Sequence, residues 1–308
     1  MSGRWGGSGS GLSAFSGRLL GPSLILLCTS IWGAAFLAQK LGAAHFGPFA
    51  FNSYRNFLGF ALLFVVQFAR RGRGGILPTR RERIGGAASG VALCAAMMAQ
   101  QLGIEQTSPG ISAFLTANYV LLVPIFAWAT GRGRPAADVW VSVALAAYGT
   151  YLISVTGEDR FAVGRGELWT LLCAALFAVQ IMVVDRFAHD VDVLRFSMVQ
   201  LFVAALVALP FVLLPSELAR AGWEPFVAGL PALLFVGLLS SGVAYTLQNL
   251  GQALTPPALA AILMSMESVF GAFFGWLILR DSLAGRQLAG CALVLGAVIL
   301  SQLWRKWR

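Results

Sequence analysis

Two charged side chains stand inside long apolar stretches of this sequence, far from any turn. Glu267 lies near the middle of the stretch 257–279, and Arg55 lies about two turns into the stretch 48–69. A bare carboxylate among apolar helices is costly, so Glu267 must be protonated, paired or turned toward a wet cavity. It would then bind an amine, take up a proton, or form a permanent ion pair or hydrogen bond between helices.

The segment around Arg55 is unusually polar for an apolar stretch, because Asn52, Ser53, Tyr54 and Asn56 flank the arginine. An arginine can hold a carboxylate through two parallel hydrogen bonds, which makes Arg55 a candidate ligand for an anionic group of a solute. The alternatives are that its guanidinium pairs with backbone carbonyls at a helix end, or that it extends outward to water.

Neutral polar side chains lie at similar depth in both halves of the chain. Each one alone is typical of a hydrogen bond between helices, but together they indicate a shared polar cavity. They are Gln100, Gln101, Asn118, Tyr119, Gln180, Gln200, Tyr245, Gln248, Ser265 and Ser268. Trp32, Phe36 and Phe177 either form aromatic walls for a solute or pack in the core. The predicted binding residues are Glu267, Arg55, Trp32, Gln100, Asn118, Tyr119, Gln180, Tyr245 and Gln248.

The residues that hydrolytic or metal chemistry requires are missing from the apolar stretches. His45 and His189 fall in connecting segments far apart in sequence, and neither an HExxH nor a GxSxG pattern is present. The cysteines lack metal-site spacing, so we interpret them as small packing residues. They are Cys28, Cys94, Cys173 and Cys291. The sequence therefore predicts no enzymatic activity, no cofactor and no metal site.

Ten apolar stretches of about 20 residues supply the framework for these side chains, and each is long enough to cross a hydrocarbon layer of roughly 30 Å as a helix. Hydrophobic residues make up 58% of the chain and charged residues 11%, against about 25% charged residues in soluble domains. We therefore predict an all-α integral membrane protein with ten transmembrane helices. The predicted helices are 20–40, 48–69, 84–103, 108–130, 137–156, 167–187, 194–214, 226–247, 257–279 and 284–304.

The net charge of +9 does not indicate nucleic-acid binding, because the basic residues lie at helix ends and in connections rather than on one folded face. Their distribution predicts orientation instead, since cytoplasmic segments of membrane proteins are enriched in Lys and Arg. With the N-terminus inside, the inner segments carry 15 basic residues and the outer segments carry six. We expect both termini and the loop from Arg70 to Arg83 in the cytoplasm, and the protein in a bacterial inner membrane.

An internal repeat relates the two halves of the chain. At an offset of 148 residues the matched pairs are Gly103 and Gly251, Thr107 and Thr255, Pro109 and Pro257, Tyr119 and Glu267, and Trp128 and Trp276. An offset of 145 aligns Cys28 with Cys173 and Trp32 with Phe177. Because each copy has an odd number of helices, the second copy enters the membrane from the opposite side, as in the inverted repeats of secondary transporters. Tyr119 and Glu267 are thereby predicted to lie near the pseudo-symmetry centre.

The repeat divides the chain into five parts. They are a disordered cytoplasmic N-terminus 1–19, a first five-helix repeat 20–156, an outer linker 157–166, a second five-helix repeat 167–304 and a basic cytoplasmic tail 305–308. Lys40, Glu105 and Asp185 fall at the ends of apolar stretches, where we expect solvated charges.

Four segments form a set with a fixed order and spacing, namely Leu27–Phe36 (LCTSIWGAAF), Tyr54–Asn56 (YRN), Thr107–Leu115 (TSPGISAFL) and Thr255–Gly271 (TPPALAAILMSMESVFG). In these segments the chain resembles the drug/metabolite transporter superfamily, EamA type, over roughly residues 20–303. The resemblance implies ten helices in two five-helix units, a central cavity lined by both, and solute transport that is often export.

Two positions depart from the family pattern. Arg280 and Asp281 follow Leu279, where the family often has Gly-Glu. The carboxylate that small four-helix relatives carry in their first helix, where it binds protons and cations, has no counterpart between Pro22 and Lys40.

The sequence thus predicts a secondary transporter, an exporter or exchanger of a small organic solute such as an amino acid or related metabolite. It would work by alternating access around the cavity between the two repeats. A proton-coupled multidrug exporter is the alternative, whereas a channel or a membrane-embedded enzyme is disfavoured. The expected partners are the solute and the lipid bilayer. A monomer is sufficient because one chain holds both repeats, and a dimer is also possible.

Single cysteines placed at Gly74 and at Glu158 should react with a membrane-impermeant thiol reagent from opposite sides of the membrane. The basic excess puts the first position inside and the second outside. Labelling in right-side-out and inverted vesicles, with the native cysteines replaced, measures this. Labelling of both positions from one side contradicts the predicted order of spans.

Overall fold

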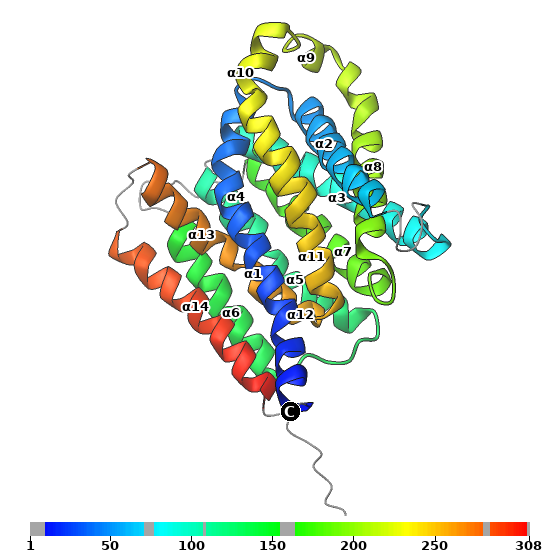
Figure 1. Ribbon diagram of the computed structural model, residues 1–308. Helices are drawn as coiled ribbons and strands as arrows, with labels where there is room; N and C mark the ends of the chain where they lie inside the picture. Colours follow the sequence, from blue (N-terminus) through cyan, green and yellow to red (C-terminus); the bar gives the residue numbers. More distant parts are fainter. Residues whose placement is uncertain (1–9, 71–76, 107–108, 155–163, 280–283, 307–308) are drawn as a thin grey trace, which may run out of the picture.

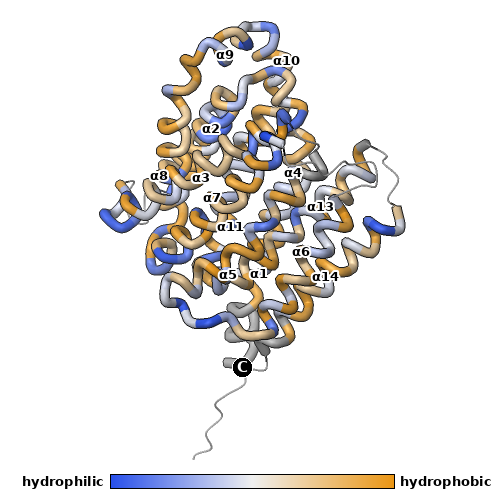
Figure 2. The backbone as a smooth tube through the Cα atoms, turned by 180° about the vertical axis from the view of Figure 1, so that it is seen from behind, coloured by the Kyte–Doolittle hydropathy of each residue, from blue (hydrophilic) through white to orange (hydrophobic). Residues whose placement is uncertain are grey.

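The computed structural model describes residues 10–70, 77–106, 109–154, 164–279 and 284–306, and these ranges contain helices and no strand (Figure 1). Nine of the described helices are long and apolar enough to cross a membrane, and Gly285–Ser301 forms a shorter apolar helix. Figure 2 shows that hydrophobic positions run along the helices, whereas many hydrophilic ones gather in the connections between them. The prediction of an all-helical, multi-pass membrane protein is confirmed.

The first half of the chain forms six helices. They are α1 (Ser10–Ala43), α2 (Pro48–Ala69), α3 (Arg80–Gln106), α4 (Pro109–Ala117), α5 (Tyr119–Ala129) and α6 (Ala137–Ser154). Prolines begin α2 and α4, where a missing N–H removes no internal hydrogen bond. A turn at Asn118 separates α4 from α5, which together fill the predicted span 108–130.

The second half forms α7 (Arg165–Phe187), α8 (Val193–Ala208), the 3-10 turn η1 (Leu209–Leu213), α9 (Pro215–Leu218), α10 (Trp223–Leu234), the π-helix η2 (Phe235–Ala244), α11 (Tyr245–Ala253), α12 (Pro257–Met264), α13 (Met266–Phe274), the π-helix η3 (Gly275–Leu279) and α14 (Gly285–Lys306). α10, η2 and α11 continue one another from Trp223 to Ala253. Pro231, which cannot donate a backbone hydrogen bond, lies inside α10 shortly before η2 begins.

The chain ends differ from the sequence prediction. α1 begins at Ser10, so residues 10–19, which we expected to be disordered, are helical. The apolar residues Leu12, Phe15 and Leu19 recur at helical spacing, and no proline interrupts the helix there. α14 continues to Lys306 and includes the start of the predicted tail 305–308. Residues 1–9 and most of the predicted linker 157–166 lie outside the described residues.

Helices from the two halves of the chain interleave. α3 packs against α7 and α8, α2 packs against α8 and η2, and α1 crosses η2, α11, α12 and α13. α6 and α14 lie side by side along one flank of the molecule (Figure 1). Glycines allow this approach, because a Cβ added at Gly290 would lie only 2.6 Å from the carbonyl oxygen of Gly149.

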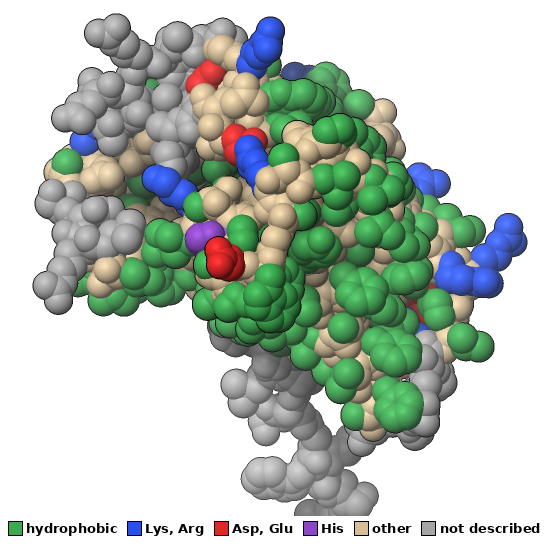
Figure 3. Space-filling view, turned by 90° about the horizontal axis from the view of Figure 1, so that it is seen from above, with side chains coloured by type: hydrophobic (Ala, Val, Ile, Leu, Met, Phe, Trp, Pro, Cys, Tyr) green, Lys and Arg blue, Asp and Glu red, His purple; other side chains and the backbone are tan. Residues whose placement is uncertain are grey.

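Large apolar side chains cover much of the outer surface, as expected of helices that face lipid. Leu27, Phe57, Val65 and Ile299 are each more than half exposed. Figure 3, which looks onto the end of the molecule where α9 lies, shows hydrophobic side chains over the visible flank and only scattered charged ones.

Charges at helix ends are paired more often than we predicted. Lys40 is exposed as expected, but Glu105 accepts a hydrogen bond from Arg220 at 2.8 Å. Asp185 is buried, forms an ion pair with Arg132 and lies 3.8 Å from the Nε2 atom of His189. The prediction of a solvated charge was therefore wrong at Asp185, because the connection after α5 folds back over the end of α7.

Glu82 joins two helix starts, those of α3 and α8. It accepts a hydrogen bond from the backbone N–H of Thr79 at 2.7 Å, which is one half of a capping box at the start of α3. It also accepts from the backbone N–H of Asp192 at 3.0 Å and pairs with Arg195 at 3.1 Å. A single buried carboxylate thus ties the first half of the chain to the second.

Glu217 makes an equivalent tie at the other end of α8. Its carboxylate accepts hydrogen bonds from the backbone N–H groups of Ala50 at 2.9 Å and Phe49 at 3.4 Å, and so caps the N-terminus of α2. Gly47 allows this approach, because a Cβ at that position would overlap the carboxylate.

Replacing Glu217 by alanine should lower the free energy of unfolding by about 1–2 kcal/mol, because the orphan N–H groups of α2 lose their acceptor and the helix dipole loses its anion. Thermal unfolding in detergent measures the loss. Glu224→Ala on the exposed start of α10 is the matched control and should change stability little. Equal effects of the two substitutions would show that the Glu217 cap is unimportant.

Candidate functional site

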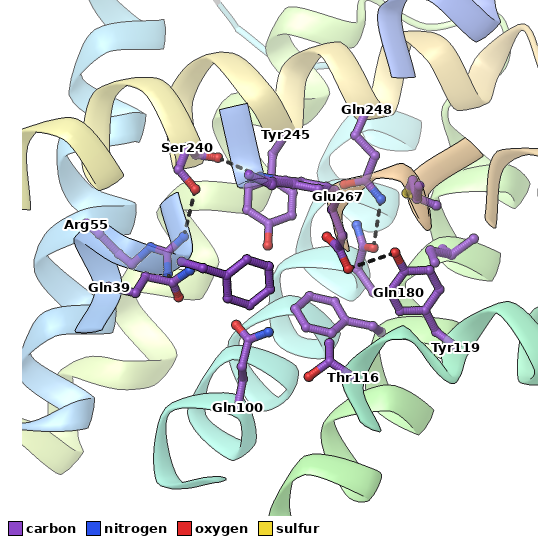
Figure 4. A pocket seen from close by; sticks show the side chains of 15 residues that line it. Gln39, Arg55, Gln100, Thr116, Tyr119, Gln180, Ser240, Tyr245, Gln248 and Glu267 are labelled. Carbon is purple, nitrogen blue, oxygen red and sulfur yellow. Dashed lines mark hydrogen bonds between the residues drawn. The ribbon is translucent and has the colours of Figure 1, made fainter. Parts of the chain in front are cut away.

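A buried cavity lies where helices of both halves meet (Figure 4). The space not filled by atoms there, including the opening of the cavity, is about 490 Å³. The lining residues are Trp32, Phe36, Gln39, Arg55, Gln100, Thr116, Tyr119, Phe177, Gln180, Ile181, Ser240, Tyr245, Gln248, Met264 and Glu267.

Arg55 supplies a positive charge to one side of this cavity. Its side chain is only 2% exposed, and its three nitrogens donate to neutral acceptors. Nε donates to the Ser241 hydroxyl at 3.0 Å, Nη1 to the Gln39 Oε1 atom at 3.1 Å and Nη2 to the Ser240 hydroxyl at 3.2 Å. Within the described part of the chain no carboxylate lies within ion-pair distance of Arg55. The guanidinium is therefore hydrogen-bonded but not neutralised.

Ser240 and Ser241 owe their position to the π-helix η2, in which both hydroxyls reach the same guanidinium. The carbonyl oxygen of Ser240 accepts a further hydrogen bond from the indole N–H of Trp32 at 3.2 Å. The Trp32 ring in turn lies 4.9 Å from the Tyr245 ring, measured between centroids. Short π-helical segments often occur at functional sites, and this one links the arginine to the aromatic wall of the cavity.

Glu267 supplies a negative charge on another side. It is the second residue of α13, next to the break at Ser265 between α12 and α13. Its Oε1 atom accepts a hydrogen bond from the Tyr119 hydroxyl at 3.0 Å. Tyr119 begins α5 beside the matching break at Asn118. The pair that sequence repetition places near the pseudo-symmetry centre is thus in direct contact.

Arg55 and Glu267 do not pair with each other in this structure. Figure 4 shows Arg55 and Gln39 on one side of the cavity and Glu267 with Tyr119 on the other, with Tyr245 between them. The sequence left open whether Glu267 forms a permanent ion pair with the arginine. The geometry instead gives each charge its own neutral hydrogen-bond partners.

An amide network closes a third side of the cavity. Gln248 donates to the Oε1 atoms of Gln180 at 3.2 Å and Gln252 at 2.9 Å, and Gln252 donates to the Ile181 carbonyl oxygen at 3.2 Å. Gln180 approaches the Ser89 hydroxyl at 3.5 Å. These contacts hold α7, α11 and α3 together through neutral groups.

Eight of the nine predicted binding residues line this one cavity, and Asn118 does not. The Asn118 amide donates to the carbonyl oxygens of Phe114 at 3.0 Å and Leu115 at 3.2 Å within its own turn. These two bonds turn the Asn118 amide back onto the backbone before it, whereas its neighbour Tyr119 lines the cavity.

Other polar residues that we grouped with the cavity have structural partners. Gln200 accepts a hydrogen bond from Asn249 of another helix at 2.6 Å, and Ser265 donates to the carbonyl oxygen of Ile262 in its own helical turn at 2.6 Å. The lining residues that we did not predict are Gln39, Thr116, Ile181, Ser240 and Met264. The offset of 148 relates Thr116 to Met264, so the sequence carried a signal for that pair.

The cavity offers one guanidinium, one carboxylate, amides, hydroxyls and aromatic faces. Within the described ranges no group of three or more His, Cys, Asp or Glu side chains could hold a metal ion. Such a lining can recognise a small polar molecule through charge and hydrogen bonds.

Several known proteins are similar to this chain. The sequence pattern of the EamA-like transporter family matches residues 19–155 and, a second time, residues 164–303. An uncharacterized transporter of Archaeoglobus fulgidus is 28% identical over 284 residues, which span 92% of this chain and 85% of that protein. The threonine/homoserine exporter RhtA of Escherichia coli strain K12 is 28% identical over 285 residues, which span 92% of this chain and 90% of the exporter. A solved structure described as "Crystal structure of protein" shares the fold, with a TM-score of 0.77 at 19% identity over 94% of this chain and 96% of that one.

Tyr119→Phe removes only the hydroxyl that donates to Glu267, and we expect it to lower the free energy of unfolding by about 1–3 kcal/mol because the buried carboxylate loses this donor. Tyr148→Phe is the control, since Tyr148 is 57% exposed. Thermal unfolding of the purified variants compares them. If Tyr119→Phe is as stable as the control, the hydrogen bond does not stabilise the fold.

Proposed function

Because the chain belongs to the EamA-like transporter family, we propose that it is a secondary transporter for a small zwitterionic solute of the amino-acid class. The family match confirms the resemblance to drug/metabolite transporters that the sequence motifs indicated. The observation that carries the proposed substrate class is that Arg55 and Glu267 line one buried cavity without pairing to each other.

An α-amino acid presents the two charges that these residues complement. The carboxylate of the solute replaces one or more of the neutral acceptors on Arg55, since a charged acceptor makes a stronger hydrogen bond than an amide or a hydroxyl. The ammonium group binds Glu267, whose Oε1 atom is held by Tyr119. Solute binding thereby neutralises both buried charges. The name of the E. coli relative, a threonine/homoserine exporter, supports the same class.

We further propose ten transmembrane helices in two inverted repeats. The family pattern matches the chain twice, and α4–α5 and α12–α13 are interrupted at nearly equivalent residues, Asn118 and Ser265. The helix packing is also repeated with the two halves interchanged. α3 of the first half packs on α7 of the second half, and α11 of the second half packs on α1 of the first half. Five pairs of cavity residues fall at the repeat offsets, namely Trp32 and Phe177, Phe36 and Ile181, Gln100 and Gln248, Thr116 and Met264, and Tyr119 and Glu267.

We propose that the two carboxylate ties take part in alternating access. Glu82 holds the starts of α3 and α8, and Glu217 holds the start of α2 beyond the opposite end of α8. In our proposal one tie loosens while the other stays closed, so the cavity opens to one side at a time. Each tie ends on backbone N–H groups, which water can satisfy when the contact opens.

The expected setting is the inner membrane of a bacterium, with both termini in the cytoplasm. The described start of α1 and the end of α14 lie at the same end of the molecule (Figure 1), as an even number of crossings requires. We propose that a monomer is sufficient for transport, because the family pattern matches this one chain twice.

A proton-coupled exporter of organic cations is the second candidate. One observation favours it, because Glu267 has no cationic partner within the described chain and could exchange a proton or a bound cation. In that case Arg55 plays no part in substrate recognition, which separates the two candidates.

Counterflow in proteoliposomes tests the proposed substrate class. Vesicles loaded with an unlabelled neutral amino acid should accumulate the labelled form, and a decarboxylated amine or a deaminated acid of equal size should compete poorly. Accumulation driven by amines that lack a carboxylate, together with a pH gradient, supports the second candidate instead.

Arg55→Lys should lower amino-acid counterflow at least about tenfold, because a lysine keeps the charge but cannot reproduce the planar fork. Glu267→Gln should lower it similarly and still fold, since Arg55 keeps its neutral partners and Tyr119 keeps an acceptor. Glu224→Gln on the exposed start of α10 is the control. Stable variants with unaltered flux would exclude both residues from substrate binding.

A further inference from the structure

Two glutamines occupy equivalent positions in the two halves, but among the described residues only one of them forms side-chain hydrogen bonds. Gln100 and Gln248 are separated by the repeat offset of 148, and both line the cavity. Gln248 donates to Gln180 and to Gln252 and so belongs to the amide network. Gln100 makes no hydrogen bond within the described chain, although its side chain is only 7% exposed.

We propose that Gln100 recognises the side chain of the transported solute, and that this side chain carries a hydroxyl or a carboxamide. The inference rests on the proposed amino-acid substrate class and narrows it. The Gln100 amide lines the cavity and has no hydrogen-bond partner in the described chain, so a solute that supplies both a donor and an acceptor can bind it. Hydroxyl and carboxamide groups do so, whereas aliphatic groups do not.

The position of Gln100 fits a third point of attachment. Figure 4 shows its amide on α3, away from Tyr245 and apart from both Arg55 and Glu267. With the solute carboxylate at Arg55 and its ammonium group at Glu267, the side chain of an α-amino acid projects toward the remaining walls. Phe36 and Phe177 make part of those walls apolar, and Gln100 supplies an amide there that can bind a polar side chain, as the Tyr245 hydroxyl also can.

Neighbouring residues distinguish this role from a structural one. Gln101 is also buried, and its Nε2 atom lacks a hydrogen-bond partner, but it does not line the cavity and cannot reach a solute there. Thr116 lines the cavity, but its hydroxyl lies against the Cys173 sulfur at 4.0 Å. Gln100 therefore combines an amide that has no hydrogen-bond partner among the described residues with a position in the cavity lining.

Isosteric pairs of amino acids test the inference in proteoliposomes that contain the full chain. The pairs are threonine and valine, homoserine and norvaline, and asparagine and leucine, each offered as a competitor of labelled alanine counterflow. In the parent protein the polar member of each pair should compete about tenfold better, the value expected when one hydrogen bond to the solute is made or lost. Gln100→Met, which keeps the length of the side chain, should abolish that preference, measured as the ratio of competition by the polar and the apolar member of each pair.

Gln101→Met is the matched control and should keep the preference of the parent protein. Equal competition by polar and apolar members in the parent, or a preference that survives Gln100→Met, overturns the role of Gln100 while the amino-acid class stands. If alanine itself drives no counterflow and none of the six competitors is carried, the substrate class is refuted and the inference falls with it. Thermal unfolding of each variant shows whether a lost flux reflects lost folding.

Discussion

Much of this structure depends on the need to provide hydrogen-bond acceptors for a guanidinium group buried among apolar helices. Arg55 cannot be left without acceptors at that depth, because an unsatisfied charge in an apolar interior costs several kcal/mol. The chain provides Gln39 from α1 and two consecutive serines from η2, and the π-helix is what brings both serines to one guanidinium. α1, α2 and η2 are thereby fixed against one another around a positive charge.

The internal repeat explains the matching walls of the cavity, but it does not explain where the charged residues lie. Paired positions from both halves give matching walls, whereas the residue at offset 145 from Arg55 is Gln200, which accepts from Asn249 between helices. The charged Arg55 cluster thus has no charged counterpart in the second half of the chain. A neutral amide network around Gln180 and Gln248 forms a third side of the cavity. A duplicated scaffold with unequal polar groups can hold a solute in one orientation, which a strictly symmetric lining cannot do.

The sequence predicted well how far polar residues lie from the helix ends, but it predicted poorly which way their side chains point. Hydropathy marks Glu267 and Arg55 as polar residues far from any surface, and the repeat predicted that Tyr119 and Glu267 would be close. Hydropathy does not tell which way a side chain turns about its helix, so Asn118 was placed with Tyr119 although the two diverge. Asp185 was misjudged for a related reason, since its burial depends on Arg132 from a distant connection.

Neutral partners on both charges suit a protein that must bind and then release. A carboxylate in contact with Arg55 would compete with any anionic solute and would hold the arginine in one state, because a buried ion pair is costly to separate. Amide and hydroxyl acceptors bind Arg55 more weakly, so a solute carboxylate can replace them. Likewise, the Tyr119 hydroxyl is a neutral donor to Glu267 that a solute ammonium group can replace. A solute that carries both charges satisfies the two sides at once, so its differential binding between states can drive the change of state. In the mechanism that we propose, the same groups return to their neutral partners when no solute is bound, so that neither charge is left without a hydrogen bond during the reverse step.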